Sequence, residues 1–253
     1  MSQFQFKLPN VRRCFIPDPG YYVCDCDLAQ ADAQVVAWEA DDEILKTIFR
    51  DPNADLHDQN TQDIFNISPG HPDFKKKRQL AKFGVHLTNY GGRERTCAST
   101  LGITVAEASN FQRRWFQIHP NIKDWHRRIE DQLLTNRTIT NAFGYRRQYF
   151  DRIDRCFTEA LAWIPQSTVA LVITKAMIAS EAFPVLEPLL QVHDSYIVQF
   201  PIRKKDEGLR AMYECMHQEI PYEDPLTIPA GAELHSTSWG DVEKVKWPES
   251  CNG

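Results

Sequence analysis

The chain has 253 residues, of which 42% are hydrophobic, and a formal net charge of −5. This length and apolar content suffice for a buried core, in one domain or in two intertwined lobes. We find no apolar run of transmembrane length and no signal peptide, which excludes membrane and secreted classes and predicts a soluble, intracellular protein.

The periodicity predicts mainly helices, with strands near the two ends of the chain. A strand at residues 21–26 is followed by helices at residues 29–48, 55–65, 75–90, 104–119 and 121–134. A hairpin around Gly144 is expected at residues 137–150, then a long apolar helix at residues 159–183 that is interrupted near Pro165. Strands at residues 189–192 and 196–200 complete the pattern, and Thr104 with Glu107 forms a capping box.

The helix at residues 75–90 has a polar stripe. Its members Arg78, Lys82, His86 and Tyr90 recur at every fourth position and therefore share one face. A solvated surface is the ordinary interpretation of such a pattern. Cations near a helix N-terminus oppose the helix dipole, however, and a bound polyanion would account for them.

Two aspartates lie at the ends of predicted strands, Asp27 in CDLAQAD and Asp194 in QVHDSYIVQF. An aspartate in this position usually forms a turn or a helix cap. If the two carboxylates lie close together, their repulsion is relieved by a divalent cation, and oxygen ligands favour Mg²⁺.

The seven cysteines predict free thiols. Their number is odd, no CxxC occurs, and Cys24 and Cys26 share one face of a strand without a second ligand cluster. Positive charge gathers at residues 75–155, which hold 17 Lys and Arg against 7 Asp and Glu, while the remainder holds 12 against 27. Rings interleaved with these basic residues are typical of nucleic-acid binding.

Taken in chain order, these stretches resemble the DNA polymerase I-like enzymes of DNA polymerase family A, in a phage-type variant. Residues 27–32 (DLAQAD) resemble the motif DYSQIE, residues 78–91 resemble RxxxKxxxFxxxYG, and residues 191–195 (QVHDS) resemble QVHDE. Further segments of the family are matched by residues 55–57, 116–120, 144–147 and 165–167.

The resemblance implies an α+β fold, with a polymerase palm of antiparallel sheet and packed helices and a mainly helical fingers subdomain. The palm is expected at residues 1–48 and 157–253, and the fingers at residues 49–156. We expect no thumb or exonuclease domain in this chain. A second polypeptide that supplies the thumb and primer grip is therefore expected to dock near residues 4–11.

The resemblance also implies template-directed transfer of a nucleotide from a deoxynucleoside triphosphate (dNTP) to a primer 3′-hydroxyl on primer–template DNA. The implied catalytic residues are Asp27, Asp194 and Lys82. Two Mg²⁺ ions, with Mn²⁺ as the alternative, would be bound by Asp27, Asp194 and the carbonyl of Leu28. The implied nucleotide-binding residues are Gln30, Asp32, His57, Arg78, Lys82, His86 and Tyr90. The implied DNA-binding residues are Arg12, Arg146, Arg147, Gln166 and His193. The expected location is the cytoplasm of a bacterium or a phage-infected host.

Four positions depart from the family pattern. Ser195 replaces a second acid, Asp32 a glutamate, His86 an aromatic residue and Ala162 an asparagine. These departures leave open an alternative function, a non-catalytic nucleic-acid-binding subunit derived from a polymerase. A metal nuclease that uses Asp27 and Asp194 would leave the polar stripe unexplained.

Overall fold

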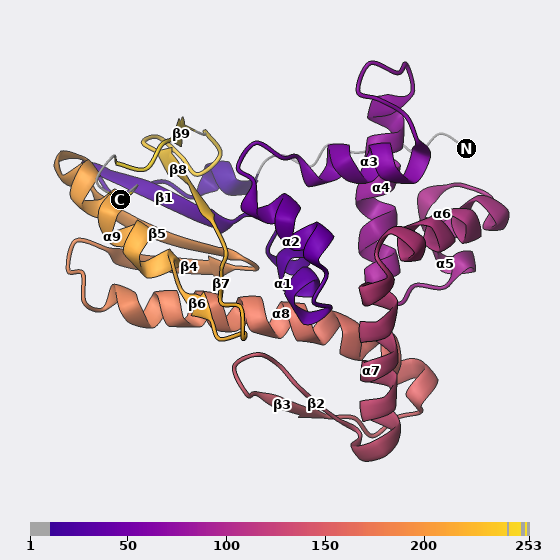
Figure 1. The fold of residues 1–253 in the computed structure, drawn as a ribbon. Coiled ribbons are helices and arrows are strands. Elements are labelled where there is room, and N and C mark those ends of the chain that lie inside the picture. The colour runs from indigo at the N-terminus through magenta and orange to yellow at the C-terminus, as the bar shows by residue number, and fades with distance from the viewer. Residues whose placement is uncertain (1–10, 242, 249–250, 252–253) are drawn as a thin grey trace. The chain divides into compact units, whose positions relative to one another are not determined.

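The computed structural model describes residues 11–241, 243–248 and 251. By its internal contacts the chain divides into two compact units. We call them the sheet unit, which holds the residues up to Ala29 and from Val169 onward, and the helical unit, residues 30–168 (Figure 1). Helix α8 (Ile153–Ser180) contributes its first part to the helical unit and its last part to the sheet unit.

The sheet unit is built on a five-stranded antiparallel sheet. Its strand order is β4-β5-β1-β8-β9. These strands are β1 (Tyr21–Leu28), β4 (Glu187–Val192), β5 (Ser195–Pro201), β8 (Ala230–His235) and β9 (Glu243–Val245). The unit also holds the short turns η1 (Val11–Cys14) and η2 (Ile202–Lys204), helix α9 (Lys205–Met216) and the pair β6 (Glu219–Ile220) and β7 (Leu226–Thr227). The strands predicted at residues 21–26, 189–192 and 196–200 are confirmed.

Alternation along β1 separates the two faces of the sheet. Cys24 and Cys26 are fully buried on the face against which α9 packs. The packing is close, because a Cβ atom added to Gly208 of α9 would lie 2.5 Å from Cγ of Phe200 on β5. All seven cysteines are free thiols, as predicted. The opposite face carries the odd-numbered side chains of β1, including Asp27.

The helical unit contains seven helices before α8 in the part of the chain that the structure describes. They are α1 (Ala31–Glu39), α2 (Glu43–Arg50), α3 (Leu56–Phe65), α4 (Phe74–Asn89), α5 (Glu94–Leu101), α6 (Val105–Ile118) and α7 (Pro120–Asn136). A hairpin of β2 (Thr138–Thr140) and β3 (Arg146–Gln148) follows them. The predicted hairpin and the capping box at the start of α6 are both confirmed.

Helix α4 packs closely on α6. A Cβ atom at Gly84 would lie 2.6 Å from Cζ of Phe111, so only glycine allows this approach without a shift. Ala81 and Val85 are buried beside Gly84. The stripe of Arg78, Lys82 and His86 therefore lies on another face of the helix.

The single helix predicted at residues 29–48 is wrong, because α1 and α2 are separate helices. Asp41 adopts a left-handed conformation with φ 54°. Asp42 then caps α2, and its Oδ1 accepts a hydrogen bond from the Leu45 amide at 3.0 Å. A cap at Asp42 satisfies an amide that a continuous helix would satisfy through its backbone.

The predicted interruption near Pro165 is also wrong, because α8 continues through the proline. Leu161 and Ile164 before it, and Val172 and Ile173 after it, are at most 1% exposed. Burial of each such side chain contributes roughly 1.5–3 kcal/mol, which together outweighs the cost of about 3 kcal/mol for an internal proline.

Helix α8 is also long and apolar enough to cross a membrane by length and composition alone, with a mean hydropathy of 1.4 over its most apolar window, 44% of which is buried. The prediction that no apolar run reaches this length is therefore wrong. A buried core helix meets the same criteria, so this finding does not by itself make α8 a membrane span.

The contact division differs from the predicted palm and fingers boundaries. Residues 30–48 and 157–168 belong to the helical unit. The assignment of palm and fingers to residues 1–48, 49–156 and 157–253 remains a prediction.

Candidate active site

Asp27 and Asp194 come to neighbouring strands of the sheet unit. Asp27 on β1 pairs with Ser195 of β5, and Asp194 directly precedes Ser195. The Leu28 amide donates a hydrogen bond to the Asp194 carbonyl oxygen at 3.1 Å, which ties the two strand ends together. The structure therefore brings together the two aspartates that were predicted to bind metal.

A two-residue turn positions Asp194. Val192 pairs with Ser195, so His193 and Asp194 form the whole connection between β4 and β5. His193 has a positive φ of 54°, as tight hairpin turns require. Its carbonyl accepts a hydrogen bond from Nε2 of Gln191 at 2.8 Å. His193, a predicted DNA-binding residue, is exposed beside the aspartate.

The surroundings of Asp27 raise its pKa and so disfavour the charged carboxylate in the absence of a cation. Partial burial raises the pKa of Asp27, a hydrogen bond from Ser195 lowers it, and the charges of Asp194, Asp25 and Glu233 raise it. Repulsion among clustered carboxylates is relieved when a divalent cation binds. This end of the sheet is therefore suited to a cation.

The ligand set fits Mg²⁺ bound together with a substrate. Among the described residues there is no group of three or more His, Cys, Asp or Glu side chains placed to hold a metal. Mg²⁺ is commonly bound by one or two carboxylates and takes its other ligands from water and substrate phosphates. The carboxylates of Asp27 and Asp194 fit that mode, and the metal-binding role of the Leu28 carbonyl remains a prediction.

Arg12 is held on the same face of the sheet. Its guanidinium lies 3.6 Å from Oδ2 of Asp25 and 4.5 Å from the ring centre of Trp239. The Trp239 indole N–H donates to the same oxygen at 2.8 Å. With a side chain that is 53% exposed, Arg12 still faces solvent. Its contacts with Asp25 and Trp239 were not predicted from the sequence.

In the helical unit, Arg78 is paired with carboxylates at the start of α3. Its Nη2 lies 2.7 Å from Oδ2 of Asp55, and its Nε donates to Asp58. Asp55 also caps α3 by accepting a hydrogen bond from the Asp58 amide at 2.9 Å. The guanidinium of Arg78, which was predicted to bind phosphate, therefore pairs with two carboxylates. The pairing with Asp58 was not predicted from the sequence.

His57 lies in the first turn of α3, near the cations of α4. Burial lowers the pKa of His57, and the charges of Lys82 and Arg78 lower it further, against the opposite effects of Asp55 and Asp58. Lys82 itself is exposed. Two cations beside a helix N-terminus favour anions, whereas Asp55 and Asp58 at the same place offset this charge, so phosphate binding by this cluster remains a prediction.

Tyr90 and Asp32 are joined by a hydrogen bond. The Tyr90 hydroxyl donates to Oδ2 of Asp32 at 2.6 Å, and burial together with that carboxylate raises the pKa of Tyr90. The rings of His86 and Tyr90 lie 4.4 Å apart. Gln30, which precedes α1 with φ 51°, is exposed. The structure thus brings Asp32, His86 and Tyr90 together.

The remaining predicted DNA-binding residues lie on and beside the β2–β3 hairpin. Arg146 is exposed, whereas Arg147 pairs with Glu159. Gln166 is exposed on α8. Its neighbour Ser167 accepts a hydrogen bond at 2.9 Å from Asn141, which begins the turn between β2 and β3.

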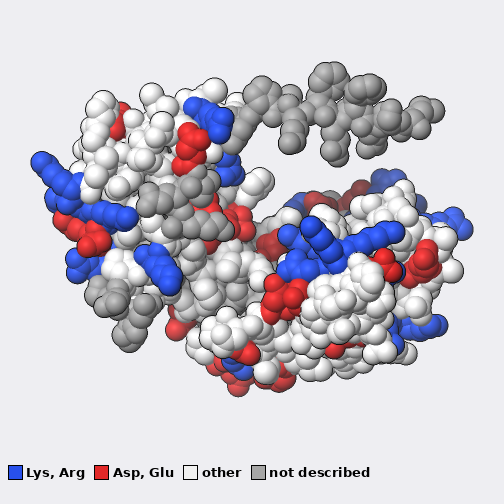
Figure 2. Space-filling model, turned by 90° about the horizontal axis from the view of Figure 1, so that it is seen from above, with Lys and Arg blue, Asp and Glu red and all other residues white. Residues whose placement is uncertain are grey.

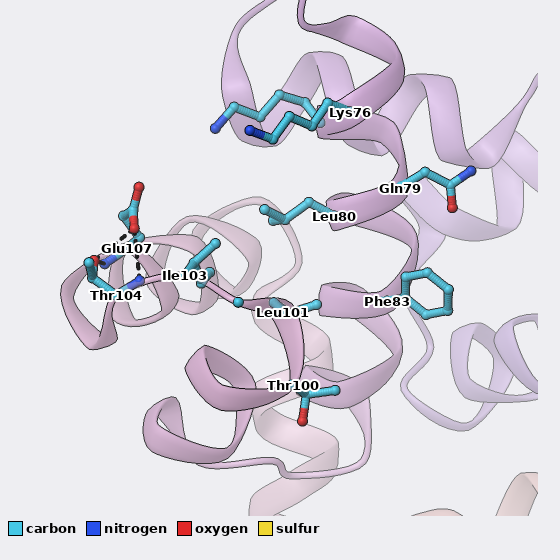
Figure 3. Close-up of a pocket in the computed structure, with 11 residues that line it drawn as sticks. Lys76, Gln79, Leu80, Phe83, Thr100, Leu101, Ile103, Thr104 and Glu107 are labelled. Atoms are coloured by element: carbon cyan, nitrogen blue, oxygen red, sulfur yellow. Dashed lines mark hydrogen bonds between the residues drawn. The ribbon is translucent and has the colours of Figure 1, made fainter. Parts of the chain in front are cut away.

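Figure 2 shows a dense group of Lys and Arg side chains on the surface of the helical unit. A groove of about 680 Å³ lies between α4 and residues 100–107, away from the stripe of Arg78, Lys82 and His86. Leu80, Leu101 and Ile103 line it, with Lys76 and Glu107 at its edge (Figure 3). The predicted nucleotide-binding residues do not line this groove, so it is separate from the candidate site.

Comparisons with known proteins agree with this arrangement. Residues 5–241 match the model of DNA polymerase family A. Over 88% of its length the chain is 30% identical to a thermostable DNA polymerase I of Thermus filiformis, and over 92% it is 28% identical to a DNA polymerase of Mycobacterium phage D29. Among solved structures it resembles the polymerase domain of Pol1 from M. smegmatis in complex with DNA primer-template and dNTP, with a TM-score of 0.80 and 22% identity over 90% of this chain.

The predicted α+β fold, with an antiparallel sheet and packed helices, is confirmed by this structural likeness. The chain spans 28% of the length of the Thermus filiformis protein, 37% of the phage protein and 42% of the Pol1 domain chain. The family model nevertheless covers nearly all of this chain, and the chain therefore belongs to DNA polymerase family A.

Proposed function

We propose that this chain catalyses template-directed transfer of a nucleotide from a dNTP to the 3′-hydroxyl of a DNA primer. The observation that supports it best is the meeting of Asp27 and Asp194 at one end of the sheet, tied by the hydrogen bond between the backbones of Leu28 and Asp194. A second support is the proximity of Arg78 and Lys82 of α4 to His57 in the first turn of α3, which places two cations beside a helix N-terminus.

Asp27, Asp194 and the carbonyl of Leu28 would hold the metal in this reaction. When bound, two Mg²⁺ ions, or Mn²⁺ in their place, lower the pKa of the primer hydroxyl and neutralise the triphosphate. Lys82, exposed on α4, binds the phosphates and donates a proton to the leaving pyrophosphate.

The other residues bind and orient the substrates. Arg78 and His57 hold the β- and γ-phosphates. Asp32 and Tyr90, linked by their hydrogen bond, flank the sugar and base with His86 and Gln30. The DNA contacts are assigned to Arg12, Arg146, Arg147, Gln166 and His193. The sheet unit then corresponds to the palm, and the helical unit corresponds mainly to the fingers.

The proposal includes a second polypeptide that supplies a thumb and primer grip. Outside residues 75–155 the chain holds 12 basic and 27 acidic residues. The net negative charge of this part repels duplex DNA. In the sheet unit, Phe15, Ile16 and Leu189 are exposed around an apolar groove of about 330 Å³, which is suited to a protein partner. Most of the predicted docking segment, residues 4–11, lies outside the described residues. The proposed location is the cytoplasm of a bacterial or phage-infected cell.

Primer extension by charge-removing variants tests this function. We expect Asp27→Asn and Asp194→Asn to abolish extension, because each loses a metal ligand, while Asp206→Asn, an exposed carboxylate on α9, leaves it unchanged. Extension by either variant at more than a few per cent of wild type contradicts the assignment. Primer–template binding without any extension by the wild-type chain, alone or with a partner, favours the non-catalytic alternative.

A further inference from the structure

Ser195 occupies a defined place beside Asp27. The two residues pair directly across β1 and β5, and Ser195 Oγ donates a hydrogen bond to Oδ1 of Asp27 at 2.8 Å. The strand ladder and the bond from the Leu28 amide to the Asp194 carbonyl fix the backbone on both sides of this contact. The hydroxyl is therefore presented to Asp27 by a rigid part of the sheet.

This contact is the favourable one among the neighbours of the Asp27 carboxyl. The carboxylates of Asp194, Asp25 and Glu233 act on Asp27 as like charges, whereas Ser195 donates a hydrogen bond to it. Because Ser195 is uncharged, it satisfies Oδ1 without adding another negative charge. The other carboxyl oxygen remains available to a ligand, since the structure shows no hydrogen bond to Oδ2 among the described residues.

We propose that Ser195 is a positioning residue, which holds the Asp27 carboxylate by Oδ1 so that Oδ2 is presented to a divalent cation. This inference rests on the proposed function, because it assumes that Asp27 is a metal ligand. Groups that orient a metal ligand by a hydrogen bond commonly contribute tenfold to a hundredfold in metal affinity. Ser195 itself touches neither metal nor substrate.

The test is the affinity of the full chain for Mn²⁺ without nucleotide, measured by electron paramagnetic resonance of the free ion. We expect Ser195→Ala to weaken Mn²⁺ binding by about tenfold or more. Ser195→Thr keeps the hydroxyl and is expected to stay within about threefold of wild type. Ser180→Ala is the matched control. Ser180 lies in the same unit, donates a hydrogen bond to the Met177 carbonyl and contacts the Tyr196 hydroxyl, and it does not contact Asp27.

A double-mutant cycle separates positioning from general damage to the fold. In an Asp27→Asn background, Ser195→Ala is expected to change Mn²⁺ affinity by less than twofold, because the carboxylate it orients is gone. Equal Mn²⁺ affinities of wild type and Ser195→Ala would overturn the positioning role and leave the proposed function standing. Absence of any Mn²⁺ binding to the wild-type chain would overturn the positioning role, while the proposed function, in which substrate phosphates complete the metal site, is judged by primer extension. Loss of affinity in Ser180→Ala as large as in Ser195→Ala would show an unspecific structural effect and also overturn the role.

Discussion

The ion pairs of Arg78 predict that removing a carboxylate will strengthen nucleotide binding. Arg78 is assigned to the phosphates, yet its guanidinium is held by Asp55 and Asp58 at the start of α3. A bound triphosphate must compete with these carboxylates. Asp58→Asn removes one charge and leaves the cap made by Asp55 in place, since that cap uses the Asp58 backbone amide.

The size of the effect follows from the exposure of the pair. The side chains of Arg78 and Asp58 are 29% and 37% exposed, so solvent screening limits their interaction to about 0.5–1 kcal/mol. A bound triphosphate would have to break the interaction between Arg78 and Asp58. In Asp58→Asn this interaction is already absent, so the dNTP dissociation constant should be about twofold to fivefold lower.

Single-turnover incorporation over a range of dNTP concentrations measures that constant. Asp63→Asn is the matched control. Asp63 belongs to the same helix, and its carboxylate accepts hydrogen bonds from Gln59 and not from Arg78. An unchanged or raised dissociation constant for Asp58→Asn, or an equal decrease for Asp63→Asn, would refute the competition between carboxylates and phosphates.

Three further predictions follow from the same residues. Lys82→Ala should lower the single-turnover rate more than Arg78→Ala, each lost charged hydrogen bond costing about 1.5–3 kcal/mol; effects of both confined to dNTP affinity would reverse the roles. Asp32→Ala should relax selection against ribonucleotides, and an unchanged preference in competition assays would exclude Asp32 as the residue that judges the sugar. Burial lowers the pKa of His126 to about 4 from 6.5, so the unfolded chain binds this proton first. The free energy of unfolding should therefore be at its full value above pH 6.5 and fall by about 3 kcal/mol towards pH 4. Urea titrations should show this slope and its loss in His126→Gln.

Local patterns in the sequence predicted the elements that carry the candidate site. The four-residue period of Arg78, Lys82 and His86 placed them on one face of α4. The apolar runs at residues 189–192 and 196–200 predicted two strands with residues 193–195 between them, of which Ser195 belongs to β5 in the structure. These features depend on neighbours in the chain, which is why spacing and the family resemblance both found them.

Features that depend on tertiary packing were not predictable in this way. The burial of Leu161 and Ile173 decides that α8 continues through Pro165. The hydrogen bond from Ser195 to Asp27 joins residues far apart in the chain, and a lone serine gives no sign of such a contact. Helix α9 was not predicted. Its position is determined by packing on the sheet, where Gly208 lies against Phe200, and this contact is not visible in the local sequence.

The central claim is that this chain joins nucleotides on a template, and incorporation of one nucleotide tests it most directly. The purified chain is mixed in excess with primer–template DNA, Mg²⁺ and each dNTP in turn, opposite each of the four template bases. We predict that only the complementary nucleotide is added, that chelation of the metal stops the reaction, and that Asp194→Asn is inactive. Addition that ignores the template base, or that persists in Asp194→Asn, would contradict the account.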